Sequence, residues 1–153
     1  MEIRMKLITA ISLSMLLLSV SLASAATEEA KAVKMVNDAI EFFKTNGREK
    51  TFAEIANKKG RFHEGELYVF VYDLNGNILA HGHEPELVGT NRLNVTDSSG
   101  KQYVKERLAL IKEKGEGWQT YQYKNPVTGK VENKKTFVKK YDDLIFCSGI
   151  YTD

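Results

Sequence analysis

The chain has 153 residues, of which 42% are hydrophobic and 27% are charged. This composition is typical of one globular domain with enough apolar side chains for a core. The net charge of +2 provides no polybasic surface, so nucleic acid is not an expected partner. The single cysteine, Cys147, excludes an internal disulfide, and its apolar neighbours between residues 144 and 150 indicate a buried thiol rather than a nucleophile.

The first 25 residues have the pattern of a secretory signal peptide. Arg4 and Lys6 precede a largely apolar stretch that ends in the small-residue cleavage motif Ala23-Ser24-Ala25. An uncleaved membrane anchor is the alternative, because the stretch approaches the ~20 residues that span a bilayer. The serines and the cleavage motif favour removal. We therefore expect a signal peptide over residues 1–25, a single domain over residues 26–153, and a periplasmic or secreted protein.

Two helices are predicted next. Residues 27–44 carry apolar side chains at three- and four-residue spacing, and Asn46-Gly47 ends this helix. The apolar stripe is wide enough to cover the sheet of its own chain and a second copy, which predicts a parallel homodimer through this helix. A shorter helix is expected over residues 51–59, because Thr51 and Glu54 form a capping-box pattern.

A β-hairpin is predicted over residues 67–81. Three aliphatic side chains alternate with three aromatic ones in its first strand, so one face is aliphatic and the other aromatic; the aromatic side chains are Tyr68, Phe70 and Tyr72. Residues 73–77 (DLNGN) supply a tight turn. The aromatic face needs a covering layer, and that layer can leave room for a ligand.

One more helix and three more strands complete the chain. The helix is expected over residues 98–114, with Asp97 as its N-cap and Gly115 at its end. The strands are expected over residues 117–124, 134–141 and 144–151. The predicted fold class is therefore α+β, with a five-stranded antiparallel sheet and a long N-terminal helix.

The motifs YVFVYDLNGNILAHG, PELVGTN, KGEGWQTYQYKNPVTGK and KKTFVKKYDDLIFCSGIY follow one another in this order. In this respect the chain resembles the single Cache domains of the second type, extracytoplasmic small-molecule sensors with a PAS-like sheet, over about residues 68–151. The resemblance implies a helix along the sheet and a pocket between the sheet and the connecting segments. It also implies binding of a small organic acid or related metabolite. Gly82 is a departure, since many members have proline after the histidine.

The resemblance also implies a role in signal transduction. Family members commonly pass the signal to an attached receptor or kinase. No such segment follows Asp153, so the chain resembles the free-standing secreted members. A separate membrane-bound signalling partner is therefore expected.

Seven candidate ligand-binding residues follow, namely Lys134, His81, Trp118, Tyr121, Tyr72, Phe70 and Phe137. Tyrosine hydroxyls and an indole N–H can fix a polar ligand in an apolar pocket, although core packing is the alternative for about half of the aromatic residues. Strand alternation separates Trp118 from Tyr121, so both face one cavity only if a bulge intervenes. The resemblance implies a ligand-facing lysine at Lys134, whose strand is expected to neighbour both aromatic strands. A lysine favours a carboxylate ligand.

No metal, cofactor or catalytic activity is predicted. His81 and His83 would share a strand face, but no cysteine or carboxylate cluster completes a ligand set, so we expect His81 to be a hydrogen-bond donor in the pocket. The sequence contains no phosphate-binding loop, dinucleotide fingerprint or catalytic triad motif. A ligand-binding sensor domain is the favoured function, and a structural or protein-interaction module with a vestigial pocket is the alternative.

Overall fold

The computed structural model describes the backbone of residues 2–152 and the side chains of residues 27–152. The expected signal peptide, residues 1–25, lies outside the fully described part. The chain divides into two units, and the second begins at Ala32 and contains the whole sheet. Between residues 27 and 152, no helix has the length and apolar character that a membrane span requires.

The N-terminal helix α1, Glu2–Ala56, contains the two helices expected from the sequence. Its regular geometry is interrupted at Gly47, where φ is 78° and ψ is 178°, a conformation that glycine adopts without a steric penalty. The second helical segment ends at Ala56 rather than at residue 59. Thr51 is not an N-cap, because its hydroxyl donates to the Gly47 carbonyl at 2.7 Å inside the helix.

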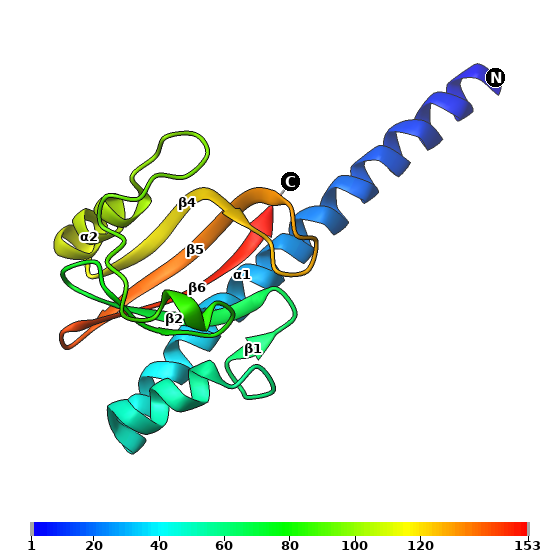
Figure 1. The fold of residues 1–153 in the computed structure, drawn as a ribbon. Helices are drawn as coiled ribbons and strands as arrows, with labels where there is room; N and C mark the ends of the chain where they lie inside the picture. Colours follow the sequence, from blue (N-terminus) through cyan, green and yellow to red (C-terminus); the bar gives the residue numbers. More distant parts are fainter. Residues whose placement is uncertain (1, 153) are drawn as a thin grey trace. The chain divides into compact units, whose positions relative to one another are not determined.

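The sheet is antiparallel and has six strands rather than the five predicted, in the order β1-β2-β6-β5-β4 with β3 paired to β2 (Figure 1). The strands are β1 (His63–Glu64), β2 (Leu67–Asp73), β3 (Ile78–His81), β4 (Glu116–Lys124), β5 (Val131–Tyr141) and β6 (Leu144–Thr152). The additional strand, β1, has only two residues, which is too short to produce a periodic signal in the sequence.

Helix α2, Tyr103–Lys114, begins five residues later than predicted. The Asp97 carboxylate accepts hydrogen bonds from the N–H groups of Ser99, Lys101 and Gln122 at 2.9, 3.0 and 2.9 Å, and it therefore shapes a turn instead of capping the helix. The helix ends as expected at Gly115, whose φ of 75° is left-handed. A short 3-10 helix, η1 (Pro85–Leu87), lies in the segment between β3 and α2.

Two cores form on the two faces of the sheet, as the alternation in β2 predicts. From Ala32 onward, the buried stripe of α1 packs on the aliphatic face, where Val36 and Val69 are fully buried. Helix α2 covers part of the aromatic face, which holds Tyr68, Phe70 and Tyr72. Burying one large apolar side chain contributes about 1.5–3 kcal/mol, so these two layers fix the sheet between them. The homodimer through α1 stays a prediction.

Candidate functional site

A small cavity lies on the aromatic face of the sheet. Eight side chains from four strands and helix α2 line it, namely Tyr68, Phe70, Tyr72, His81, Tyr103, Tyr121, Tyr123 and Lys134. Its volume is about 10 Å³, which is close to the ~10–15 Å³ that one water molecule requires. A metabolite can therefore enter only if the walls of the cavity move.

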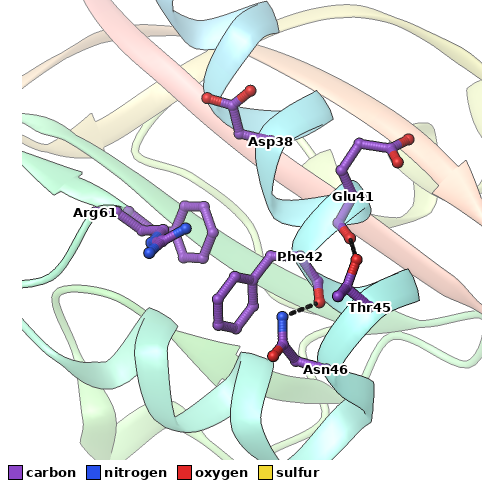
Figure 2. A pocket seen from close by; sticks show the side chains of 7 residues that line it. Asp38, Glu41, Phe42, Thr45, Asn46 and Arg61 are labelled. Carbon is purple, nitrogen blue, oxygen red and sulfur yellow. Dashed lines mark hydrogen bonds between the residues drawn. The ribbon is translucent and has the colours of Figure 1, made fainter.

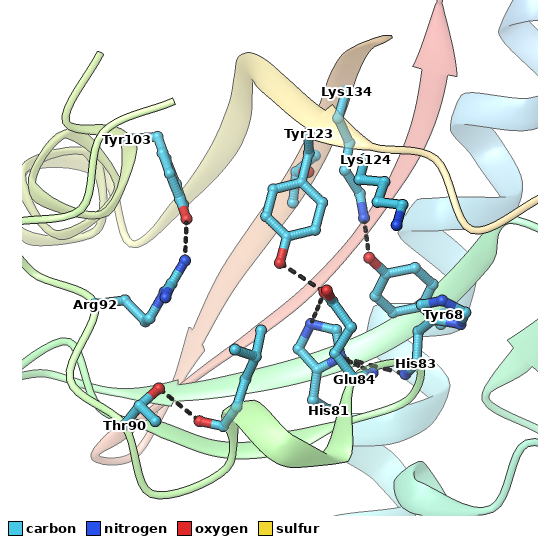
Figure 3. A network of polar contacts seen from close by, with 12 residues as sticks. Tyr68, His81, His83, Glu84, Thr90, Arg92, Tyr103, Tyr123, Lys124 and Lys134 are labelled. Atoms are coloured by element: carbon cyan, nitrogen blue, oxygen red, sulfur yellow. Dashed lines mark hydrogen bonds and ion pairs between the residues drawn. The ribbon is translucent and has the colours of Figure 1, made fainter. Parts of the chain in front are cut away.

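Lys134 on β5 is the cation of this cavity. It is 1% exposed, and its Nζ donates to the Tyr68 hydroxyl at 2.7 Å (Figure 3). The same Nζ lies 4.0 Å from the centroid of the Tyr68 ring, and three further rings lie within 5.4 Å, those of Phe70, Tyr123 and Tyr151. Burial lowers the pKa of this amine to about 7. The side chain is therefore a buried base held among aromatic rings.

The position of β5 differs from the prediction. Strand β5 pairs with β4, but β6 separates it from β2, so it neighbours only one of the two aromatic strands. Lys134 lies opposite Tyr121 on one side and Tyr151 on the other. Its long side chain nevertheless reaches Tyr68 on β2, because both side chains project from the same face of the sheet.

His81 at the end of β3 is a neutral hydrogen-bond donor. Its Nδ1 accepts hydrogen bonds from the backbone N–H groups of His83 and Glu84 at 3.2 and 2.8 Å, which assigns the proton to Nε2. Burial, followed by the nearby Lys134, lowers the pKa of His81 to about 3. The Nε2 atom lies 3.7 Å from Oε2 of Glu84. The role of His81 as a donor to a ligand stays a prediction.

Gly82 explains how the chain leaves β3 at this point. Its N–H donates to the Val69 carbonyl at 2.9 Å, a bond that a proline cannot make. A Cβ atom at Gly82 would lie 3.0 Å from that carbonyl oxygen and 3.1 Å from Cβ of Tyr68. The departure from proline therefore allows close packing of this loop on β2.

Glu84 separates the cavity from a larger hollow at the surface. Its Oε2 accepts a hydrogen bond of 2.6 Å from the Tyr123 hydroxyl, and this contact closes over the cavity beside His81 (Figure 3). On the outer side, Glu84 helps to line a hollow of about 560 Å³ together with His83 and Lys124. Opening of the Glu84–Tyr123 contact would therefore join the two spaces.

Arg107 on α2 belongs to the same aromatic cluster, and the sequence reasoning missed it. It is 0% exposed, and its Cζ lies 4.9 to 5.8 Å from the centroids of four rings that line the cavity, those of Tyr72, Phe70, Tyr121 and Tyr103. None of its three guanidinium nitrogens has a hydrogen-bond partner among the described residues. A signal was present, since Arg107 interrupts the apolar stripe of its helix at the spacing of a buried position.

Five of the seven predicted site residues come together at the cavity, namely Lys134, His81, Tyr121, Tyr72 and Phe70. Trp118 and Phe137 do not. They lie directly opposite each other in the β4–β5 pair, with ring centroids 5.3 Å apart, and pack in the core on the α1 face. The register of β4 and β5 has no bulge, so strand alternation keeps both rings away from the cavity.

Other features of the described residues do not form a comparable site. No group of three or more histidine, cysteine, aspartate or glutamate side chains in the described part of the chain could hold a metal ion. A groove of about 610 Å³ runs beside α1 on the other face of the sheet (Figure 2). Its charged side chains, Asp38, Glu41 and Arg61, are exposed, and the guanidinium of Arg61 covers the Phe42 ring at 4.9 Å.

Comparisons with known proteins agree with this architecture. A model of the family described as Single Cache domain 2 matches residues 26–153. The sensor histidine kinase MctS of Rhizobium johnstonii (strain DSM 114642 / LMG 32736 / 3841) is 34% identical over 88 residues, or 56% of this chain. The chain spans only 19% of the length of this curated relative.

Two solved structures share the fold. A methyl-accepting chemotaxis protein from Vibrio parahaemolyticus RIMD 2210633 is 21% identical with a TM-score of 0.70, over 83% of this chain and 90% of that chain. A Cache chemosensory domain described for carboxylic acid recognition is 23% identical with a TM-score of 0.66, over 87% of this chain and 97% of that chain. At these identities, the likeness shows the fold alone.

Proposed function

Because the chain belongs to the Single Cache domain 2 family, we propose that it is an extracytoplasmic sensor domain that binds a small organic acid in the cavity around Lys134. The observation that carries this proposal is the fully buried amine of Lys134, with which no described carboxylate forms an ion pair. Buried charges in proteins are normally paired, because desolvation of an isolated ion is very unfavourable. A ligand carboxylate would supply the missing partner.

The neighbouring groups suit the rest of such a ligand. The aromatic walls exclude water, and His81 offers an N–H donor at Nε2. Tyr68 adds a hydroxyl group beside the amine of Lys134, and the Tyr123 hydroxyl donates to Glu84 at the edge of the cavity. A few directed polar groups in an apolar wall are typical of sites for small metabolites. The carboxylic acid recognition described for a Cache domain of the same fold makes organic acids the first class to test.

Binding would require the cover of the cavity to move. The Glu84–Tyr123 hydrogen bond and the η1 segment close the site. We propose that a ligand enters from the outer hollow when this contact opens, and that the change in the covering segment is passed to a membrane-bound signalling partner. The signalling proteins among the similar proteins support a role for this domain in signal transduction.

Isothermal calorimetry and thermal-shift measurements with acetate, propionate, butanoate and pyruvate test the proposal. A ligand that binds only the folded state raises its stability by RT ln(1 + [L]/Kd). Loss of the charge-assisted bond in Lys134→Met should weaken binding about ten- to a hundred-fold, whereas the exposed Lys140→Met should bind normally. If the two variants bind equally well, Lys134 is not the ligand's partner. If neither these acids nor succinate binds, the vestigial-pocket alternative holds.

A further inference from the structure

We propose that the cavity is an anion site with two ends, in which Arg107 and Arg92 bind a second acidic group, so that the preferred ligand is a short dicarboxylate. This inference rests on the proposed function and extends it, because it adds a second subsite to the one at Lys134. It depends on the positions of the cations along β2, on the unpaired guanidinium of Arg107, and on the balance of charge around the cavity.

The two buried cations lie in a row along one strand. The ammonium of Lys134 lies over Tyr68 and Phe70, with centroid distances of 4.0 and 5.3 Å. The guanidinium of Arg107 lies over Phe70 and Tyr72, with centroid distances of 5.3 and 4.9 Å. Because these rings occupy successive positions on one face of β2, the cations are offset by about one two-residue step, roughly 6.5–7 Å. They therefore mark two ends of the aromatic cluster rather than one point.

Arg107 lacks the partners that a buried arginine needs. Its guanidinium presents five N–H donors in a rigid plane, and the aromatic faces around it attract the charge but do not satisfy those donors. Arginine remains protonated, so the site cannot avoid the problem by losing a proton. A carboxylate matches the planar fork of donors in a bidentate arrangement, and it is the chemical group that this position lacks.

Arg92 reaches the same end of the site from the segment that covers it. Its Nη2 donates to the Tyr103 hydroxyl at 3.4 Å, and the Tyr103 ring lies 5.8 Å from the Arg107 guanidinium. The Nε atom of Arg92 is buried and has no hydrogen-bond partner among the described residues. Figure 3 shows Arg92 and Tyr103 on one side of the site and Lys134 on the other, with His81 and Tyr123 between them.

Cations predominate around the cavity. Lys134 lines it with an amine whose pKa is about 7, and Arg107 and Arg92 contact side chains that line it. Among the described residues, Glu84 is the one carboxylate in contact with a lining side chain. His81 adds no charge, because it is neutral. Glu66 accepts hydrogen bonds from the Asn125 amide and the N–H of Tyr151, and its charge, like that of Glu84, favours the protonated form of Lys134. The two guanidinium groups therefore have no carboxylate partner among the described residues, and a second acidic group of a ligand would supply one.

A pair of matched probes tests this inference by calorimetry on the purified protein. Succinate and butanoate have the same number of carbon atoms and differ in one carboxylate, so both require a similar opening of the cavity. We expect succinate to bind at least about ten-fold more tightly than butanoate, as one further charge-assisted bond predicts. Arg107→Met should weaken succinate binding about ten-fold more than butanoate binding, so that the preference for the diacid is lost. Lys134→Met should weaken both.

The outcomes test the second subsite and the proposed function separately. Equal affinities of the wild-type protein for succinate and butanoate overturn the second subsite and leave the proposed function intact. If neither acid binds, the proposed function fails as well. Arg92 is half-buried, so Arg92→Gln provides an independent check if Arg107→Met does not fold. This variant should reduce the affinity for succinate more than the affinity for butanoate. An Arg92 variant that binds both probes like the wild type would contradict the assignment of Arg92.

Discussion

The ammonium of Lys134 donates to the hydroxyl of Tyr68 at 2.7 Å and at the same time lies 4.0 Å from the centre of the same ring. A hydrogen bond to a neutral phenol and contact with a ring face stabilise a cation less than an ion pair does. The lysine is therefore held in place by the fold but not neutralised by it. The protonation state of Lys134 should therefore affect the stability of the ligand-free protein, which can be measured.

The stability of the ligand-free protein should rise with pH between about 7 and 9. The folded pKa of Lys134, about 7, lies below the ordinary value of 10.5, because the amine is buried. The unfolded chain therefore binds more protons in this range, and unfolding becomes less favourable as the pH rises. Urea denaturation at pH 7 and pH 9 should show a gain of roughly 2–3 kcal/mol. The range stops at pH 9, because burial raises the pKa of Cys147 to about 11 from 9.0 and opposes the trend above that point.

Lys134→Met is the matched variant for this measurement. It removes the titrating group, so its stability should change much less between pH 7 and pH 9. Lys140→Met removes an exposed lysine of the same strand, two residues after the buried residues 136–138. This variant should keep the wild-type dependence of stability on pH. An unchanged slope in Lys134→Met would assign the pH dependence to another group.

Acid should destabilise the protein in a separate range. The folded pKa of His81, about 3, lies below the ordinary value of 6.5, so the unfolded chain binds more protons between these values. The contribution of neutral His81 to stability is therefore complete above about pH 6.5 and is lost progressively as the pH falls toward 3. His81→Gln should be less stable near neutral pH but should have a shallower slope between pH 6.5 and pH 4. A slope as steep as that of the wild type would exclude His81 as the main acid-sensitive group of this range.

The layered fold could be predicted from the sequence because its signals are local. The alternation of aliphatic and aromatic residues in β2 predicts two faces, and both cores form where it places them. The start of α2 could not be predicted, because Asp97 binds the N–H of Gln122 on β4, a contact between residues far apart in the sequence. The order of the strands also depends on contacts between residues far apart in the sequence. In the observed order, β6 lies between β2 and β5.

The candidate site could be predicted only in part. Lys134 and Tyr121 lie opposite each other and both line the cavity, as strand alternation allows. Phe137 is three residues from Lys134 and Trp118 is three residues from Tyr121, so an unbroken strand directs both of them to the other face. Arg107 was missed because a charged residue within an apolar helical stripe is usually assigned to the exposed side.

The contact between Glu84 and Tyr123 should control the rate of ligand entry. Tyr123→Phe removes the hydroxyl that donates to Glu84 at 2.6 Å but keeps the ring that packs beside Tyr121. The closed cover loses one charge-assisted bond, which typically contributes about 1.5–3 kcal/mol. Stopped-flow measurements with the best acid should show association several-fold faster than in the wild type. Tyr141→Phe, on the α1 face, is the control. Equal association rates in all three proteins would show that another step limits entry.

Replacement of Arg107 should stabilise the empty protein, although most changes in a core have the opposite effect. Methionine keeps a long unbranched side chain inside the aromatic cluster and removes a buried charge that has no hydrogen-bond partner among the described residues. Apolar replacement of buried ions is often neutral or stabilising by about 1–4 kcal/mol. Thermal denaturation without ligand should therefore give an equal or higher Tm for Arg107→Met, whereas Arg107→Lys, which keeps the charge, should melt at a lower temperature. Lys105→Met, an exposed change on the same helix, controls for helix propensity. A clear loss of stability in Arg107→Met would show that the four aromatic rings alone compensate the guanidinium and that Arg107 is a structural residue.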